Sequence, residues 1–467
     1  MAYVTIGQDP AKGLPPPLQH DLLLQYIADT PLGLHVKQHI QDQGYVVLPG
    51  ILTPDECDVE LERLWEFVES TAPGVHRDNP DTWYPTPCST LIPTPTTSTS
   101  TSTSTSTSTS TSISTPPAST SFATDNKSLH EDPWPHSGWK FLPDMCQSFQ
   151  AGWLFGSLRE LLAERVFAQI YGTSELHSSK EGFTFHRPTA PVAPNGSVHP
   201  VLDEERPRVC GKVQLRGHGE HFDQCASDTD LHCIQSSTSL IDQHEGSGCF
   251  MCWPGSHREH ARMTKDIWRG RSDWVPLTDE ELDGLTERGM SPKKVPVNAG
   301  DVVLWRSDLV HCGVGPSTPT SKFRAVSYTC MLPASMTPTD VLDGKLHEYM
   351  TMQTGDHRPN VKSRHFAPAK KKKKTKNTNT NTKQIMKQKS KEAKKEQVRK
   401  EEKTDSGTTT ASSEKNNQKC NVKDRIKCAR GQYFKGGPPR LTIRQAELYG
   451  LKGYGNEDQV RVGVRIK

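Results

Sequence analysis

The stretch GDVVLWRSDLVHCG, residues 300–313, decides how this chain folds. Gly300 and Asp301 open it as a tight turn, and the apolar run VVLW that follows predicts a short strand. His311 comes just after that strand and is followed closely by two glycines. A histidine at the end of a strand is where the mouth of a β-barrel would hold a ligand-binding side chain.

Short strands with turns between them fill the sequence from about residue 182 onward. Apolar and β-branched runs alternate there with Gly, Pro, Asp and Ser, as in GKVQLRG, CFMCWPG and KFRAVSYTCMLP. Many short strands with turn residues between them indicate a sandwich or a barrel.

Two amphipathic helices are predicted before the β-rich part. The first begins at Thr53, with Pro54 in its first turn and Glu56 completing a capping box. Its apolar face consists of Leu61, Leu64, Trp65 and Val68. The second is predicted within residues 148–172, with a buried stripe of Leu154, Leu158, Leu161, Leu162 and Ile170. Helices followed by a β-rich body predict an α+β domain whose helices buttress a β-core.

Two low-complexity tracts interrupt this domain. Residues 86–121 are rich in Ser, Thr and Pro, and residues 369–425 are rich in Lys, Asn and Thr. Neither has enough apolar content to offset the entropy of ordering the chain, so both are predicted to be disordered insertions. The predicted organisation is an N-terminal segment, a core domain and a C-terminal segment that packs on the core, with the bounds 1–35, 36–368 and 426–467.

Composition argues against several classes of protein. The formal net charge of +3 owes much to the Lys-rich tract, so it does not indicate a nucleic-acid groove. No apolar run approaches the roughly 20 residues that span a bilayer, and the first residues do not read as a secretory signal. A cytoplasmic protein is expected, with nuclear import through KKKKKTK as an alternative.

The 12 cysteines lack the spacing of a disulfide framework and are interpreted as reduced thiols. Cys249 and Cys252, in CFMC, could form half of a zinc site. No second cysteine pair follows at the spacing of a zinc finger, so two buried strand residues are the preferred interpretation.

A further histidine lies in GEHFDQ, residues 219–224. If this stretch runs as a strand, His221 and Asp223 point to the same face, because alternate residues do so. With His311 they would supply the two histidines and one carboxylate that hold non-haem Fe(II) in oxygenases. His218 and Glu220 form a competing pair, and spacing alone does not decide between the two pairs.

Arg324 opens the last strand-like run, RAVSYTCML. An arginine at the start of a buried strand is costly unless it meets an anion, and a carboxylate matches its planar guanidinium. Other side chains are expected to pack near the site or to reach the substrate: Lys212, Gln214, Trp253, His257 and Trp305.

The order of these residues resembles the Fe(II)/2-oxoglutarate-dependent dioxygenases, and more narrowly the phytanoyl-CoA dioxygenase family. The stretches that carry the resemblance are GYVVLPGILTPDEC, HFDQ, WPGSHREH and GDVVLWRSDLVHCGVGPS. The resemblance implies a double-stranded β-helix, or jelly roll, with the metal at its mouth. It implies that His221, Asp223 and His311 hold Fe(II), and that Arg324 pairs with the far carboxylate of 2-oxoglutarate. With O2, the cosubstrate would be converted to succinate and CO2.

The resemblance also implies hydroxylation of a small organic or acyl substrate, because related halogenases have a small residue where Asp223 stands. Two other functions stay open. One is a cupin-type metalloenzyme on the same barrel, which would have no use for Arg324. The other is a non-catalytic scaffold that binds a polyanion through the Lys-rich tract. The sequence does not identify the substrate; no membrane partner is expected, and a nucleic acid would bind only through that tract.

Overall fold

The computed structural model describes residues 22–84, 133–135, 145–148, 152–188, 219–224, 233–244, 246, 248–264, 275–315, 322–352, 357–361, 438–455 and 460–467. The chain divides into two compact units, Met1–Ser363 with Val422–Lys467, and Arg364–Asn421. All described residues lie in the first unit. The two tracts predicted to be disordered, 86–121 and 369–425, lie outside the described residues.

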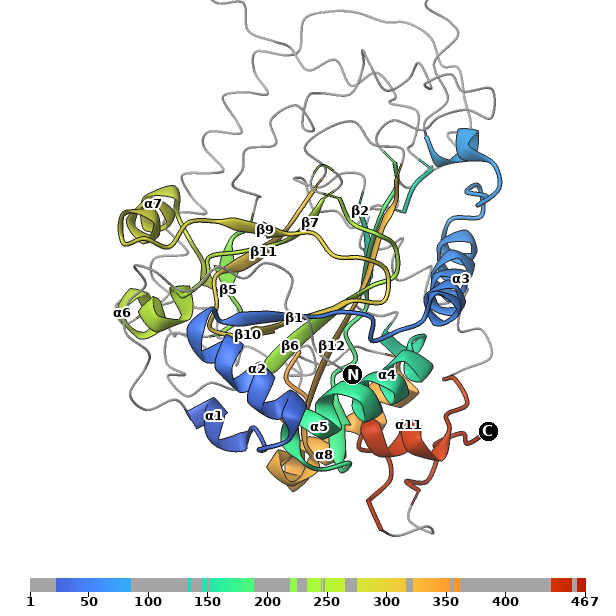
Figure 1. The fold of residues 1–467 in the computed structure, drawn as a ribbon. Helices are drawn as coiled ribbons and strands as arrows, with labels where there is room; N and C mark the ends of the chain where they lie inside the picture. Colours follow the sequence, from blue (N-terminus) through green and yellow to red (C-terminus); the bar gives the residue numbers. More distant parts are fainter. Residues whose placement is uncertain are drawn as a thin grey trace, which may run out of the picture. The chain divides into compact units, whose positions relative to one another are not determined.

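Two antiparallel sheets form the centre of this unit (Figure 1). The larger sheet has the strand order β1-β10-β6-β12-β4-β2, with β3 also paired to β12. Its strands are β1 (Tyr45–Leu48), β2 (Met145–Ser148), β3 (Leu176–Ser178), β4 (Phe183–His186), β6 (Ile234–Ser239), β10 (Val302–Arg306) and β12 (Arg324–Pro333). The smaller sheet has the order β8-β5-β11-β7-β9. Its strands are β5 (His221–Phe222), β7 (Cys249–Cys252), β8 (Val275–Pro276), β9 (Lys293–Val295) and β11 (His311–Val314).

Helices surround the sheets, so the predicted mixture of helices and antiparallel strands is confirmed. The α-helices are α1 (Leu22–Tyr26), α2 (Pro31–Asp42), α3 (Pro54–Thr71), α4 (Gly156–Leu162), α5 (Ala168–Tyr171), α6 (His260–Thr264), α7 (Asp279–Glu287), α8 (Thr339–Met350) and α11 (Ile443–Leu448). Short 3-10 helices are η1 (Pro80–Trp83), η7 (Ser256–Glu259) and η8 (Ala334–Met336), and η4 (Ala163–Phe167) is a π-helix. None of the described helices is both long enough and apolar enough to cross a membrane.

The start of α3 is as predicted. The side chain of Thr53 accepts a hydrogen bond from the backbone N–H of Glu56, whose own side chain accepts from the backbone N–H of Thr53. Glu56 also accepts two hydrogen bonds from Arg165 of η4, at 2.7 and 2.8 Å. These bonds connect the N-terminus of α3 to η4. Hydrogen bonds from Arg165 are the largest cause that lowers the pKa of Glu56 to about 2.

The low pKa of Glu56 makes its contribution to stability depend on pH. A carboxyl whose folded pKa lies below the unfolded value of about 4.3 stabilises the fold above that value and loses the contribution as the pH falls toward 2. We expect Glu56→Gln to lower the free energy of unfolding at pH 7, and the difference from wild type to shrink by pH 3. Urea unfolding at both pH values measures this, with Glu66→Gln, an exposed glutamate of the same helix, as control. A difference that does not change with pH would contradict the assignment.

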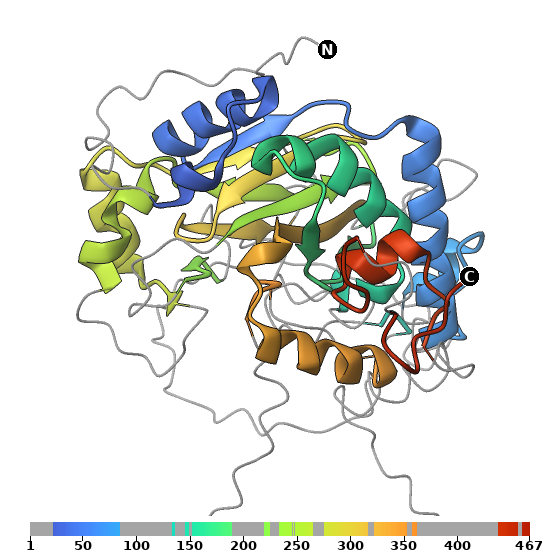
Figure 2. The same cartoon turned by 90° about the horizontal axis from the view of Figure 1, so that it is seen from below.

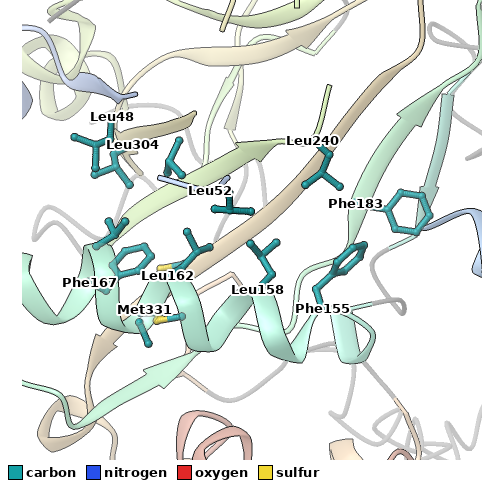
Figure 3. Close-up of a cluster of buried hydrophobic side chains, with 14 of the residues drawn as sticks. Leu48, Leu52, Phe155, Leu158, Leu162, Phe167, Phe183, Leu240, Leu304 and Met331 are labelled. Atoms are coloured by element: carbon teal, nitrogen blue, oxygen red, sulfur yellow. The ribbon is translucent and has the colours of Figure 1, made fainter. Parts of the chain in front are cut away.

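The second predicted helix differs from expectation in its middle. Residues 163–167 form a π-helix between α4 and α5, which shifts the buried face of the helix by part of a turn. Leu154, which precedes α4, and Leu161, within α4, were expected in the buried stripe but are only partly buried, while Leu158, Leu162 and Ile170 are buried as predicted. The face also buries Phe155, Ala163, Val166 and Phe167. Figure 3 shows Phe155, Leu158 and Leu162 packed beneath the larger sheet.

The two faces of the larger sheet differ in character. One face packs on the helices through apolar residues, including Leu48, Phe183, Phe185, Ile234 and Leu304. The other face meets the smaller sheet through one apolar cluster, made of Tyr45, Val47, Val303 and Trp305 with Phe250, Cys252 and Val295 of the smaller sheet. Beside this cluster, β4, β6 and β12 turn polar side chains to the same inner face: Thr184, His186, Gln235, Ser237, Arg324 and Tyr328. A polar surface enclosed between two sheets indicates a site for a ligand.

The described part of the C-terminal segment contacts α4 and β3. Helix α11 lies beside α4 and β3 (Figure 2, red beside green). Tyr449 packs on Trp153 with ring centroids 4.8 Å apart, and Tyr349 donates a hydrogen bond to the backbone oxygen of Pro439.

Candidate metal centre

His221 and His311 meet across two neighbouring strands of the smaller sheet. Strands β5 and β11 pair antiparallel with these two residues directly opposite each other. Side chains of opposite residues lie on the same face, and the ring centroids of the two histidines are 4.5 Å apart. The sheet therefore brings together two histidines that are 90 positions apart in the sequence.

Asp223 completes a three-residue cluster. One of its oxygen atoms lies 3.2 Å from Nε2 of His221, and the other lies 3.3 Å from Nε2 of His311. The three ligand atoms lie within 4.8 Å of one another, and in the part of the chain that the structure describes this is the one cluster of its kind. Donor atoms this close together could contact one metal ion, whose bonds to such ligands are about 2.1 Å long.

The backbone determines which nitrogen of each histidine faces Asp223. Nδ1 of His311 lies 2.9 Å from the backbone oxygen of Leu309, and Nδ1 of His221 hydrogen-bonds to the backbone oxygen of Gly219. A carbonyl oxygen can only accept, so each Nδ1 carries a proton, and when the ring is neutral its Nε2 offers a lone pair. Two lone pairs facing a carboxylate repel it unless a cation lies among them. The arrangement therefore suits a metal ion better than a hydrogen-bonded cluster of neutral histidines.

Charges within the cluster shift its pKa values in opposite directions. Burial favours the neutral form of Asp223, but His221 and His311 outweigh it and hold the pKa of Asp223 well below its usual value. Burial also lowers the pKa of His221, yet the charge of Asp223 raises it overall. Burial and the charge of His221 lower the pKa of His311. An ionised Asp223 is the state that a metal cation requires.

Asp223 is held by neighbours on two sides. Nε2 of Gln235 donates a hydrogen bond of 2.9 Å to one carboxylate oxygen, and the backbone N–H of Asp223 donates to the backbone oxygen of Ser307. Ser307 also donates from Oγ to the side chain of Gln224 at 2.9 Å. Gln235 was not predicted from the sequence, where it is one of five consecutive polar residues in the strand IQSSTS.

We expect Gln235→Leu to weaken metal binding without unfolding the protein. The leucine removes the donor to Asp223 but keeps much of the side-chain volume, and loss of such a supporting hydrogen bond typically costs about 10- to 100-fold in metal affinity. Titration of Fe(II) or Mn(II) under anaerobic conditions measures the change. Ser237→Ala, on the same face of β6, is the control. Equal affinities for wild type and Gln235→Leu would show that Gln235 does not orient Asp223.

Aromatic side chains line one side of the cluster. The rings of Trp305 and Phe250 have centroids 5.3 and 5.7 Å from that of His311. Both residues belong to the apolar cluster between the sheets. They restrict the ring of His311 and limit access of water to that side.

Arg324 lies on the inner face of the larger sheet, opposite β11. It is buried, and a Cβ atom built on Gly313 would lie 3.9 Å from Nη1 of Arg324. Gly313 and His311 are alternate residues of β11 and so face the same side. Within the described residues Arg324 forms no ion pair, and its Nε has no hydrogen-bond partner although it is buried. A buried guanidinium without an anion is an expensive arrangement that a bound carboxylate would relieve.

The remaining predicted residues fall into four groups. Lys212, Gln214 and His218 lie outside the described residues. Glu220 is buried but is not part of the cluster around Asp223. His257 lies in η7, with Nε2 3.2 Å from the backbone oxygen of Gln41, and Trp253 packs in an apolar cluster on the outer side of the smaller sheet. Cys249 and Cys252 are buried strand residues, as preferred above.

Comparison with known families identifies the region that contains the cluster. Residues 212–323 match the family model of phytanoyl-CoA dioxygenase (PhyH), which confirms the resemblance over this stretch. The match contains His221, Asp223 and His311, and it ends one residue before Arg324. No curated protein sequence matches the chain.

Several solved structures show a distant likeness. The chain is 14% identical to EctD from S. alaskensis, described with 2-oxoglutarate and 5-hydroxyectoine, with a TM-score of 0.35 and coverage of 72% of this chain and 87% of that one. It is 14% identical to the carbocyclase SnoK from nogalamycin biosynthesis, with a TM-score of 0.34 and coverage of 67% and 86%. It is also 14% identical to EvdO2 from Micromonospora carbonacea var. aurantiaca, with a TM-score of 0.32 and coverage of 64% and 90%. Likenesses at such TM-scores decide nothing about this chain.

Proposed function

From the family match over residues 212–323, we propose that the protein is an Fe(II)- and 2-oxoglutarate-dependent dioxygenase. It hydroxylates a small organic or acyl substrate, which is not identified, and releases succinate and CO2. We propose His221, Asp223 and His311 as the metal ligands and Arg324 as the residue that binds the cosubstrate. We further propose that the two facing sheets are the halves of a double-stranded β-helix, within a core domain of residues 36–368.

The orientation of the two histidines is the observation that carries this proposal. Backbone acceptors at both Nδ1 atoms orient the two Nε2 atoms so that they and a carboxylate face one point. Two imidazole nitrogens and one carboxylate oxygen are the ligand set of non-haem Fe(II) oxygenases, and they leave other coordination positions open. The residues present therefore fit iron.

The roles of the protein follow from its own side chains. When bound, the iron supplies the activation of O2 and the oxidative decarboxylation of 2-oxoglutarate. Gln235 holds Asp223 in place, and the backbone oxygens of Gly219 and Leu309 fix the histidine rings. Arg324 offers its guanidinium to the far carboxylate of the cosubstrate, so that its keto end points toward the metal ligands. Trp305 and Phe250 limit access of water to His311.

Formation of succinate from 2-oxoglutarate tests the proposal and also the role of Arg324. We expect iron-loaded wild type to form succinate slowly in air without a substrate, and to stop when the metal is chelated. Arg324→Leu should weaken 2-oxoglutarate binding by roughly 10- to 150-fold, the effect of a lost hydrogen bond to a charged group. The apparent affinity is measured from succinate formed against cosubstrate concentration.

A matched arginine serves as the control for this experiment. Arg159 is also buried but donates to the backbone oxygens of Ser179 and Glu181. Arg159→Leu should change stability more than cosubstrate affinity. If Arg324→Leu binds 2-oxoglutarate as tightly as wild type, a cupin-type metalloenzyme without this cosubstrate becomes the better account.

A further inference from the structure

A second polar side chain stands beside Arg324 on the inner face of the larger sheet. Arg324 of β12 is the register partner of His186 of β4. Opposite residues of antiparallel strands direct their side chains to the same face, with Cβ atoms about 5 Å apart. Both residues are 3% exposed, so neither side chain is solvated from outside.

Among the residues that the structure describes, each of these side chains has a buried nitrogen without a hydrogen-bond partner. For His186 the atom is Nε2, and for Arg324 it is Nε. The great majority of buried polar atoms in folded proteins are paired, so two neighbouring exceptions need a physical reason. A shared acceptor that binds from outside the chain would satisfy both atoms.

The protonation state of His186 also suits a bound hydrogen-bond acceptor. Burial, together with the nearby charge of Arg324, lowers the pKa of His186 to about 3, so the ring is neutral near pH 7. A neutral ring does not repel the guanidinium, and it keeps one N–H to donate. An arginine charge and an adjacent neutral N–H donor together match a carboxylate, which accepts at two oxygen atoms.

His186 and Arg324 also lie at a suitable distance from the proposed metal ligands to hold the other end of a dicarboxylate. Arg324 approaches Gly313, which lies two residues after His311 on β11. Two residues of a strand span roughly 7 Å. A five-carbon dicarboxylate held at one end by a metal at His311 can reach that far with its other end.

We propose that His186 is a second contact for the far carboxylate of 2-oxoglutarate, to which it donates a hydrogen bond from Nε2 beside the guanidinium of Arg324. The inference rests on the proposed function, because it assumes that 2-oxoglutarate is the cosubstrate. It adds a residue that neither the sequence motifs nor the matched residues 212–323 contain.

Binding of two ligands to His186 variants tests the proposal. The ligands are 2-oxoglutarate and 2-oxopentanoate, which has the same keto end but a methyl group in place of the far carboxylate. Affinities are measured by anaerobic calorimetry with Fe(II)-loaded protein, so the readout does not depend on turnover. For His186→Leu we expect 2-oxoglutarate to bind about 10- to 100-fold more weakly, while 2-oxopentanoate changes by less than about twofold. His186→Gln, which keeps an N–H donor, should recover most of the affinity.

His177→Leu is the matched control, because His177 is another buried histidine whose pKa burial lowers to about 3. Its Nδ1 pairs with Oγ1 of Thr337 and not with the inner face, so this variant should bind both ligands as wild type does. Equal losses for both ligands in His186→Leu, or no loss for either, would overturn the role of His186 and leave the proposed function intact. Absence of 2-oxoglutarate binding to wild type would overturn both.

Discussion

Replacing His311 with alanine should reduce 2-oxoglutarate turnover by roughly 1000-fold or more, equal to about 4 kcal/mol of lost stabilisation. The variant loses one of two nitrogen ligands, and the remaining pair, His221 and Asp223, leaves too few ligands to retain the metal at working concentrations. Turnover is measured as succinate formed, and bound iron is measured after desalting. The variant should retain little iron.

The control for this loss is a histidine that the metal does not need. His177→Ala removes a buried ring near α8 and should lower stability while leaving iron content near that of wild type. If His311→Ala keeps both its iron and its turnover, the metal lies elsewhere in the chain. Residues outside the described ranges, including His218, would then be the next candidates.

Replacing Asp308 with alanine should destabilise the protein by about 3–5 kcal/mol. Asp308 accepts hydrogen bonds of 2.8 and 2.9 Å from Arg306, and the two side chains are 7% and 1% exposed. The alanine variant leaves the guanidinium buried without its carboxylate partner. Because Ser307, between them, accepts from the backbone N–H of Asp223, we also expect weaker metal binding.

A double variant separates the cost of leaving Arg306 unpaired from the contribution of the ion pair itself. Arg306→Met with Asp308→Leu removes both charges and should recover much of the lost stability, since well-packed apolar residues often replace a buried pair at little cost. Urea unfolding of the metal-free proteins measures all three. A loss below about 1 kcal/mol for Asp308→Ala would show that the pair does not support the loop that carries Asp223.

The three residues proposed as metal ligands could be named from the sequence because each lies in a short, recognisable pattern. His221 and Asp223 are two residues apart, which predicts a shared face, and His311 ends a recognisable strand. Their meeting in space depends on β5 pairing with β11, and no local pattern predicts that register. The resemblance to a family supplied the long-range order that spacing does not contain.

Gln235 and His186 could not be predicted from the sequence, again because strand pairing brings them to the site. Gln235 and His186 act through cross-strand neighbours, and a polar residue in a strand gives no sign of which face is enclosed. The π-helix at residues 163–167 shifts a buried stripe that a period of 3.6 places differently. The cap at Thr53, in contrast, depends on four consecutive residues and was predicted correctly.

The visible absorption of anaerobic Fe(II)-loaded protein with 2-oxoglutarate tests the central claim most directly. Chelation of the keto acid by iron produces a metal-to-ligand charge-transfer band. The account predicts this band in wild type, its loss in His221→Ala and Asp223→Ala, and a need for more 2-oxoglutarate to reach it in Arg324→Leu. Folded, iron-loaded wild type that shows no band at saturating 2-oxoglutarate would contradict the account, because the cluster would then hold another metal or serve another chemistry.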